Sequence, residues 1–166
     1  MFNEEKAQSS AELILFIGFI LVIFIISLNF ILSENELNQA VLAASKGVND
    51  GLVSDSLAVY PEQTFNDYSL NKKSLLAPYD IKVLKIEYHD NGFDEKLNKT
   101  RIQFKVYVTS SKITDYQDRD SAGDRINFNL RKSLAYTFNS TSSTNGLFNP
   151  VYSKNYIFTT ANVVWV

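Results

Sequence analysis

Residues Gln8 to Leu32 read QSSAELILFIGFILVIFIISLNFIL, and this stretch decides the fold of the 166-residue chain. Its apolar part, Leu13–Leu32, runs for 20 residues without a charge. As a helix rising about 1.5 Å per residue it covers roughly 30 Å, the thickness of a bilayer's hydrocarbon core. A buried core helix is the competing interpretation, but purely apolar core helices seldom exceed about 14 residues. We therefore expect a membrane-spanning helix.

A short polar leader, Met1–Ala7, precedes this stretch. A secretory signal needs a positively charged start, an apolar stretch of about 7–15 residues and a small-residue cleavage site behind it. Here the charges of the leader are mixed, the apolar run is longer, and Ser33 and Glu34 continue directly into a polar segment. The apolar helix is thus expected to remain in the mature protein.

The helix is predicted to continue beyond the apolar run, as an amphipathic half over residues 34–59. Spacings of three and four residues place one set of side chains on a single face of this half. The set is Leu37, Val41, Ala44, Val48 and Leu52. Gly47 and Gly51 weaken the helix by about 1 kcal/mol each relative to alanine. Pro61 ends the pattern.

The remainder, residues 60–166, alternates between apolar and polar positions in several places, which is typical of strands. The best alternation is over Arg101–Val108, which we expect to pair antiparallel with Ile81–Tyr88 across a long loop opened by the turn His89–Gly92. A phase change at Val83-Leu84 indicates a bulge in the earlier strand.

Further strands are predicted over 126–138, with a phase slip near Arg131, and over 156–166. Polar segments over 60–79, 111–124 and 139–146 are predicted to be loops. The apolar face of a sheet needs a cover, and the amphipathic half of the helix supplies one. We therefore predict an α+β fold: a long N-terminal helix packed on a small antiparallel sheet of about four strands, in the form of a lollipop.

Composition excludes several classes of function. The chain has no cysteine, so disulfides, thiolate catalysis and cysteine metal sites are excluded. Its formal net charge is −2 with the two signs interspersed, so it lacks the basic stripe of a nucleic-acid binder. Phosphate-binding glycine loops, nucleophile elbows and paired-histidine motifs are missing as well. We expect neither an enzyme nor a cofactor.

Glu12 stands at the front edge of an uncharged span, where a carboxylate is costly to place in hydrocarbon. The motif Gln8–Glu12 followed by an apolar helix resembles the class III signal peptide of archaeal type IV pilins. The resemblance covers residues 1–35 and implies that a prepilin peptidase cuts between Ala7 and Gln8. Gln8 then becomes the first residue of the mature chain and Glu12 its fifth, the position at which pilins carry a glutamate. Lys6-Ala7 stands where Lys-Gly is commoner in the family.

Cleavage creates a cation, the α-amino group of Gln8, with which Glu12 can pair within or between subunits. The local alternative is a capping box, Ser9 to Glu12, in which the carboxylate binds the helix's own first backbone N–H groups.

Two glycan acceptor sequons occur, at Asn98 and Asn139, and pilins of this family often carry N-glycans. His89 is the single histidine. Acidic residues near it do not have the spacing of a calcium loop, and neither do Asp115, Asp118 and Asp120; we expect solvated turns and no metal site.

The resemblance implies a filament subunit with three parts: a cleaved leader (1–7), a helix (8–59, of which 8–33 spans the membrane or forms the filament core) and an extracellular domain (60–166). Expected partners are further copies of the chain, the peptidase, an assembly platform with its ATPase, and the membrane before assembly. The mature filament is extracellular and serves adhesion. Two alternatives stay open: a minor pilin that primes the filament, and a single-pass membrane-anchored binding domain.

Overall fold

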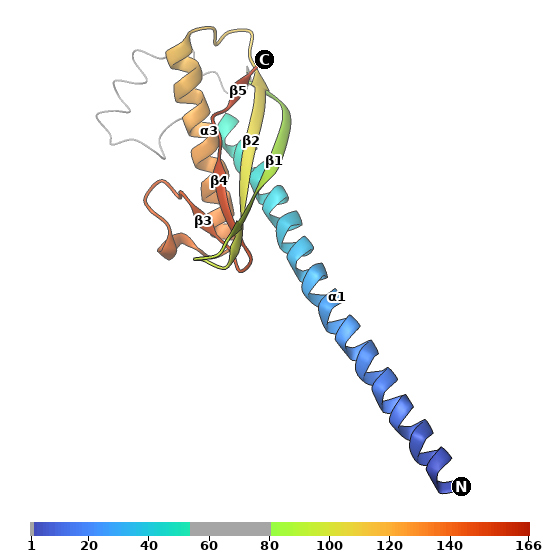
Figure 1. Ribbon diagram of the computed structural model, residues 1–166. Helices are drawn as coiled ribbons and strands as arrows, with labels where there is room; N and C mark the ends of the chain where they lie inside the picture. The colour runs from blue at the N-terminus through green and yellow to red at the C-terminus, as the bar shows by residue number, and fades with distance from the viewer. Residues whose placement is uncertain (1, 54–80) are drawn as a thin grey trace. The chain divides into compact units, whose positions relative to one another are not determined.

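The computed structural model describes the backbone of residues 2–53 and 81–166, with side chains from residue 11 onward. Helix α1 runs from Phe2 to Val53 without interruption (Figure 1). The chain divides into two compact units, Met1–Asn38 and Gln39–Val166, so α1 contributes to both. The predicted long helix is therefore confirmed as far as Val53. The rest of the predicted helix, 54–59, and the predicted loop over 60–79 lie outside the described residues.

The second unit contains a sheet that has five strands in the described part of the chain. The strands are β1 (Lys82–Asp94), β2 (Lys99–Thr109), β3 (Val151–Tyr152), β4 (Tyr156–Thr160) and β5 (Val164–Trp165). Their order is β1-β2-β4-β3, and β5 also pairs with β2. The α+β class is confirmed.

The sheet is mixed, which corrects the prediction of a purely antiparallel sheet. β1 pairs antiparallel with β2, and β3 with β4, whereas β4 and β5 both run parallel to β2. Parallel strands need a crossover of a dozen residues or more. Helix α3 (Tyr116–Thr137) lies between β2 and β4 in the chain and supplies it.

Strand β2 has the predicted alternation. Ile102, Phe104, Val106 and Val108 are all buried, while the residues between them are half-buried. Phe104 lies 6.0 Å from Phe158 of β4 and 6.2 Å from Tyr88 of β1, measured between ring centroids. Its ring therefore contacts both neighbouring strands on the covered face of the sheet.

Strand β1 is longer than predicted, and its turn lies elsewhere. The predicted bulge is present as a register shift between Val83 and Lys85. Residues 89–92 were predicted as a turn but belong to β1, where a second register shift accommodates Gly92 at φ +89°. The turn follows at 95–98, because the Asp94 carboxylate accepts hydrogen bonds from the backbone N–H groups of Lys96 and Leu97. The connection is short rather than long.

Residues 111–115 form a loop as predicted, but helix α3 replaces the rest of the loop predicted over 111–124 and the strand predicted over 126–138. Asp115 caps its start by accepting from the N–H groups of Gln117 and Asp118. Four of the buried apolar residues recur every four positions and so lie on one face of the helix. They are Ala122, Ile126, Leu130 and Leu134. The polar residues Asn127 and Asn129 alternate with apolar ones, which is the pattern of a half-buried strand. In the structure both asparagines are buried.

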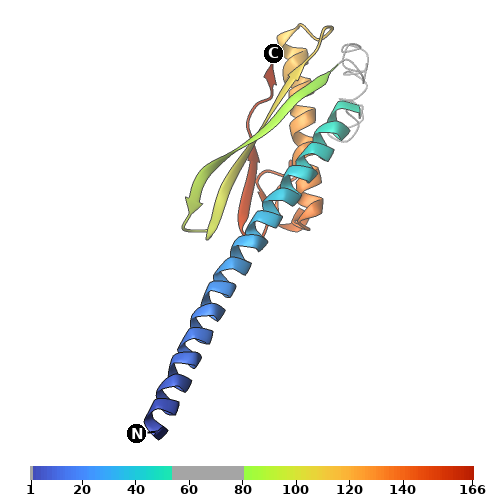
Figure 2. The ribbon, with the colours of Figure 1, turned by 90° about the vertical axis from the view of Figure 1, so that its right-hand side faces the viewer.

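The end of α1 packs against α3 through glycines. A Cβ atom at Gly47 would lie 2.5 Å from the backbone oxygen of Asn129, and one at Gly51 would lie 2.9 Å from the Cα of Ile126. The two backbones thus approach more closely than any side chain permits. Figure 2 shows α3 and residues 39–53 of α1 side by side on one face of the sheet.

The predicted apolar face of this half is confirmed in its later part. Ala44, Val48 and Leu52 are buried, whereas Leu37 and Val41 are half-buried. Ala40 and Ala43 join the buried set, so the covered face is rich in small residues.

Candidate functional site

The surface of α1 over Leu13–Leu32 is the first candidate site. Its large apolar side chains are between 41% and 76% exposed. Within the described residues, one helix is long and apolar enough to cross a membrane, with a mean hydropathy of 3.0 over its most apolar window. Exposed apolar surface of this extent indicates burial against a membrane or against other chains.

Two polar side chains within the run bind the helix's own backbone. The Ser27 hydroxyl donates to the carbonyl of Ile23 at 2.9 Å, and the Asn29 amide nitrogen donates to the carbonyl of Ile25 at 3.1 Å. These hydrogen bonds lower the cost of placing the two side chains in an apolar medium.

The residues of the predicted cleavage and assembly site all lie within α1. Ala7 and Gln8 are in its backbone, and the side chains up to Ser10 are outside the described set. Glu12 is exposed and follows Gln8 by four residues, or about 6 Å along the axis. An N-cap must stand at the start of a helix, but α1 already begins at Phe2. The capping box is thus available only to a chain that begins near Gln8.

Both sequon asparagines are exposed and have left-handed backbone conformations. Asn98 has φ 53° in the turn between β1 and β2, and Asn139 has φ 50° just after α3. Asn139 closes a Schellman motif, since its own N–H donates to Tyr136 O and the N–H of Ser140 donates to Ala135 O. Asparagine tolerates this conformation well, so each residue has a structural reason to be present. Glycan attachment at either remains a prediction.

The acidic segments and His89 have structural surroundings that differ from the predicted turns. His89 lies in β1 opposite Gln103, and Asp115 caps α3. In the regions the structure describes, no group of three or more histidine, cysteine or acidic side chains is close enough to hold a metal ion.

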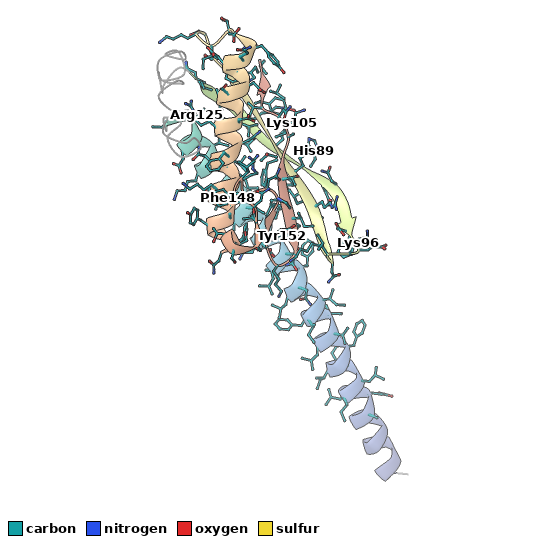
Figure 3. All side chains as sticks on the ribbon, turned by 90° about the vertical axis from the view of Figure 1, so that its left-hand side faces the viewer. His89, Lys96, Lys105, Arg125, Phe148 and Tyr152 are labelled. Atoms are coloured by element: carbon teal, nitrogen blue, oxygen red, sulfur yellow. The ribbon has the colours of Figure 1, made fainter. Side chains whose placement is uncertain are left out.

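The open face of the sheet carries charged pairs. Lys85 Nζ lies 2.6 Å from Glu87 Oε1, and this hydrogen bond raises the pKa of Lys85 and lowers that of Glu87. The Lys85 ammonium also lies 4.4 Å from the centre of the Tyr107 ring. Lys105 of β2 pairs with Glu87 in the strand register, and His89 pairs with Gln103. Figure 3 labels His89 and Lys105 on these two strands. The Lys85 and Glu87 side chains are 54% and 37% exposed, so this face of the sheet contacts water.

Comparison with known proteins adds no assignment: no protein-family model, curated protein sequence or solved structure matches the chain.

Proposed function

We propose that the chain is a structural subunit of an archaeal type IV pilus, cut by a prepilin peptidase before Gln8 and polymerised through α1. One observation carries the proposal: an uncharged, exposed helical surface over Leu13–Leu32 begins directly after Glu12 of the motif Gln8–Glu12. The chain has no enzymatic role in this proposal. Its partners are other copies, the peptidase, and an assembly platform with its ATPase.

The physical chemistry of the apolar helix supports a polymer. Lipid tails are as apolar as these side chains, so apolar helices gain no hydrophobic free energy by associating inside a bilayer. A motor must extract the subunit, and the helix must be buried again against other helices. The large side chains of Leu13–Leu32 suit such a core. The extracellular filament then presents residues 81–166 to water, where it serves adhesion.

The first test is the mass of the mature protein. Intact-mass measurement on chain isolated from its native membrane or filament should show the loss of Met1–Ala7, which leaves Gln8 as the first residue. The net charge should change from −2 to −1, because Glu4, Glu5 and Lys6 are removed together. A membrane-anchored binding domain would retain Met1, and a secreted protein would begin after Leu32; either result would contradict the proposal.

The second test separates insertion from assembly. Glu12→Ala should insert into membranes at least as well as the wild type, because it removes a group that hydrocarbon disfavours. The yield of sheared filaments should fall sharply, since removing one partner of a buried ion pair costs about 3–5 kcal/mol. The variant is expressed without a wild-type copy, and membrane-bound subunit is compared with filament yield. Gln39→Ala, at an exposed position on the same helix, is the control.

Normal filaments from Glu12→Ala would mean that the carboxylate does no more than cap its own helix. Loss of the variant from the membrane would instead indicate a targeting or folding role. A minor pilin would give processed subunit at low abundance in wild-type filaments, which quantitative mass spectrometry of those filaments distinguishes.

A further inference from the structure

A hollow of about 240 Å³ lies between the first half of α3 and residues 162–165. It is smaller than the roughly 300–1,000 Å³ of pockets for drug-sized ligands, so it suits one small molecular unit. Two aromatic, two acidic and two amide side chains line it. They are Tyr116, Trp165, Asp120, Asp124, Asn127 and Asn162.

The base of the hollow is formed by residues of α3 spaced four apart, each of which meets one residue of the segment 161–165. The three pairs are Asn127 Nδ2 donating to Ala161 O at 2.9 Å, Gly123 against the Val163 side chain, and the Arg119 guanidinium 5.6 Å from the centre of the Trp165 ring. Arg119 Nε also donates to Ile113 O at 3.0 Å. These contacts fix the helix and the segment relative to each other, so the hollow is preformed.

A second row on α3, again spaced by four, forms one wall of the hollow: Tyr116, Asp120 and Asp124. Burial raises the pKa of Asp124, and the neighbouring carboxylate of Asp120 raises it further. Hydrogen-bond donors on a ligand would therefore stabilise the two carboxyl groups of this wall.

Asn127 belongs to the lining of the hollow, but its amide oxygen is itself closed off from solvent. Its side chain is 6% exposed, and its Oδ1 has no hydrogen-bond partner among the described residues, although its Nδ2 is satisfied by Ala161. An unsatisfied buried amide oxygen is costly. The lining of the hollow thus combines carboxyl, amide and guanidinium groups with an aromatic surface.

We propose that this hollow binds one neutral sugar unit of a glycan. The hydroxyl groups of a sugar donate to the carboxylates of the wall and to the amide of Asn162, and they accept from the guanidinium of Arg119 and from Tyr116. The C–H face of the sugar ring packs on the aromatic side chains of the lining, Tyr116 and Trp165, whose ring faces carry negative partial charge. The guanidinium of Arg119 already supplies a positive charge beside the two carboxyl groups, so the lining does not require a cationic ligand.

The site lies entirely within the second unit, so it stands independently of filament assembly. The experiment uses the full chain as monomer in a neutral polyoxyethylene detergent, because sugar detergents would compete for the site. Methyl glucoside, galactoside and mannoside are titrated separately and followed by calorimetry. The fluorescence of Trp165, the single tryptophan, is the local reporter. Tetramethylammonium is the cationic probe.

Two tyrosines on α3 provide a matched pair of variants. Tyr116 and Tyr136 are 79% and 64% exposed, but only Tyr116 lines the hollow. We expect at least one methyl hexoside to saturate the site. Affinity should fall about tenfold or more in Asp124→Asn and Trp165→Ala, as for loss of a hydrogen bond to a charged group or of an aromatic contact. Tyr116→Ala should also weaken binding, whereas Tyr136→Ala should leave it unchanged.

Saturation by tetramethylammonium without any response to the hexosides would overturn the proposal in favour of a cation site. No response to any hexoside in the folded wild type would overturn it outright. Equal losses in Tyr116→Ala and Tyr136→Ala would place the sugar elsewhere. Because the assay uses monomer, none of these outcomes affects the proposal of a filament subunit.

Discussion

Residues 13–32 and residues 39–53 belong to one continuous helix, yet they differ in how their apolar side chains are buried. The first segment carries large residues, nearly all exposed. The second buries small residues, Ala40 and Ala44 among them, and its glycines Gly47 and Gly51 pack against the chain's own α3. One secondary structure therefore serves two environments, and side-chain size separates them.

The difference shows what each segment requires. Small side chains let two backbones approach, so the second segment completes its packing inside one chain. Large side chains leave the surface of the first segment unsatisfied within the chain, so an external apolar environment must cover it. Substitutions of the same type in the two segments should therefore have different consequences.

The largest effect is expected from a charge placed in each segment. Val48 is fully buried, so Val48→Asp should destabilise the second unit by about 3–5 kcal/mol, the cost of an uncompensated buried charge. Ile20→Asp should leave that unit's stability unchanged and instead make membrane insertion less favourable by about 2.5–3.5 kcal/mol. Urea unfolding of the full chain in detergent, followed by Trp165 fluorescence, measures the first effect, and a membrane-insertion assay measures the second.

Equal destabilisation of the second unit by both variants would break the comparison. It would mean that the exposed segment contributes to the folding of residues 81–166. If neither variant altered the unfolding transition, Val48 would not be part of the core.

A smaller effect, with a reversal of sign, is expected from the glycines. Glycine to alanine normally stabilises a helix by about 1 kcal/mol. At Gly18 no atom lies within 4 Å of the added methyl group, so Gly18→Ala should keep that gain and leave the second unit unchanged. At Gly47 the methyl group meets the backbone of α3, and Gly47→Ala should cost about 1–3 kcal/mol through overpacking. Parallel unfolding curves compare the two variants, and a stabilised Gly47→Ala would refute the close packing of the helices.

The sequence predicted the elements whose pattern depends on one exposed and one covered face. Strand β2 has three charged side chains on one face and apolar residues on the other, so its alternation identifies both. The apolar run of α1 was equally clear. Helix α3 was missed because Asn127 and Asn129 are buried polar residues, held by hydrogen bonds to Ala161 O and Arg125 O. Their polarity suggested solvent, but their hydrogen bonds allow them to be buried.

A signal for α3 was nevertheless present in the sequence. Asp115 followed by residues with apolar spacing of four, from Ala122 onward, is a helix start and a helix face. The parallel direction of β4 depends on this helix, so both errors have one cause. The hollow at Asp124 and Trp165 could not be predicted, because these two residues from α3 and β5 lie 41 positions apart in the chain. Likewise, the sequence shows Gly47 only as a residue of low helix propensity, because its close packing depends on the position of α3.

The smallest effect tests the exposed side of the second segment. Leu42 is 72% exposed although its neighbours Ala43 and Ala44 are buried. Because Leu42→Ser removes no packing within the chain, the unfolding free energy of the second unit should change by no more than about 0.5 kcal/mol. Ala44→Ser, on the covered side, is the matched control and should cost more, since it buries a hydroxyl group among apolar atoms. If Leu42→Ser leaves unfolding unchanged but lowers filament yield, Leu42 lies in a contact between subunits, and the need for an external partner extends beyond residue 32. If filament yield is also unchanged, an external partner is needed only over the apolar run, and the second segment is packed entirely within its own chain.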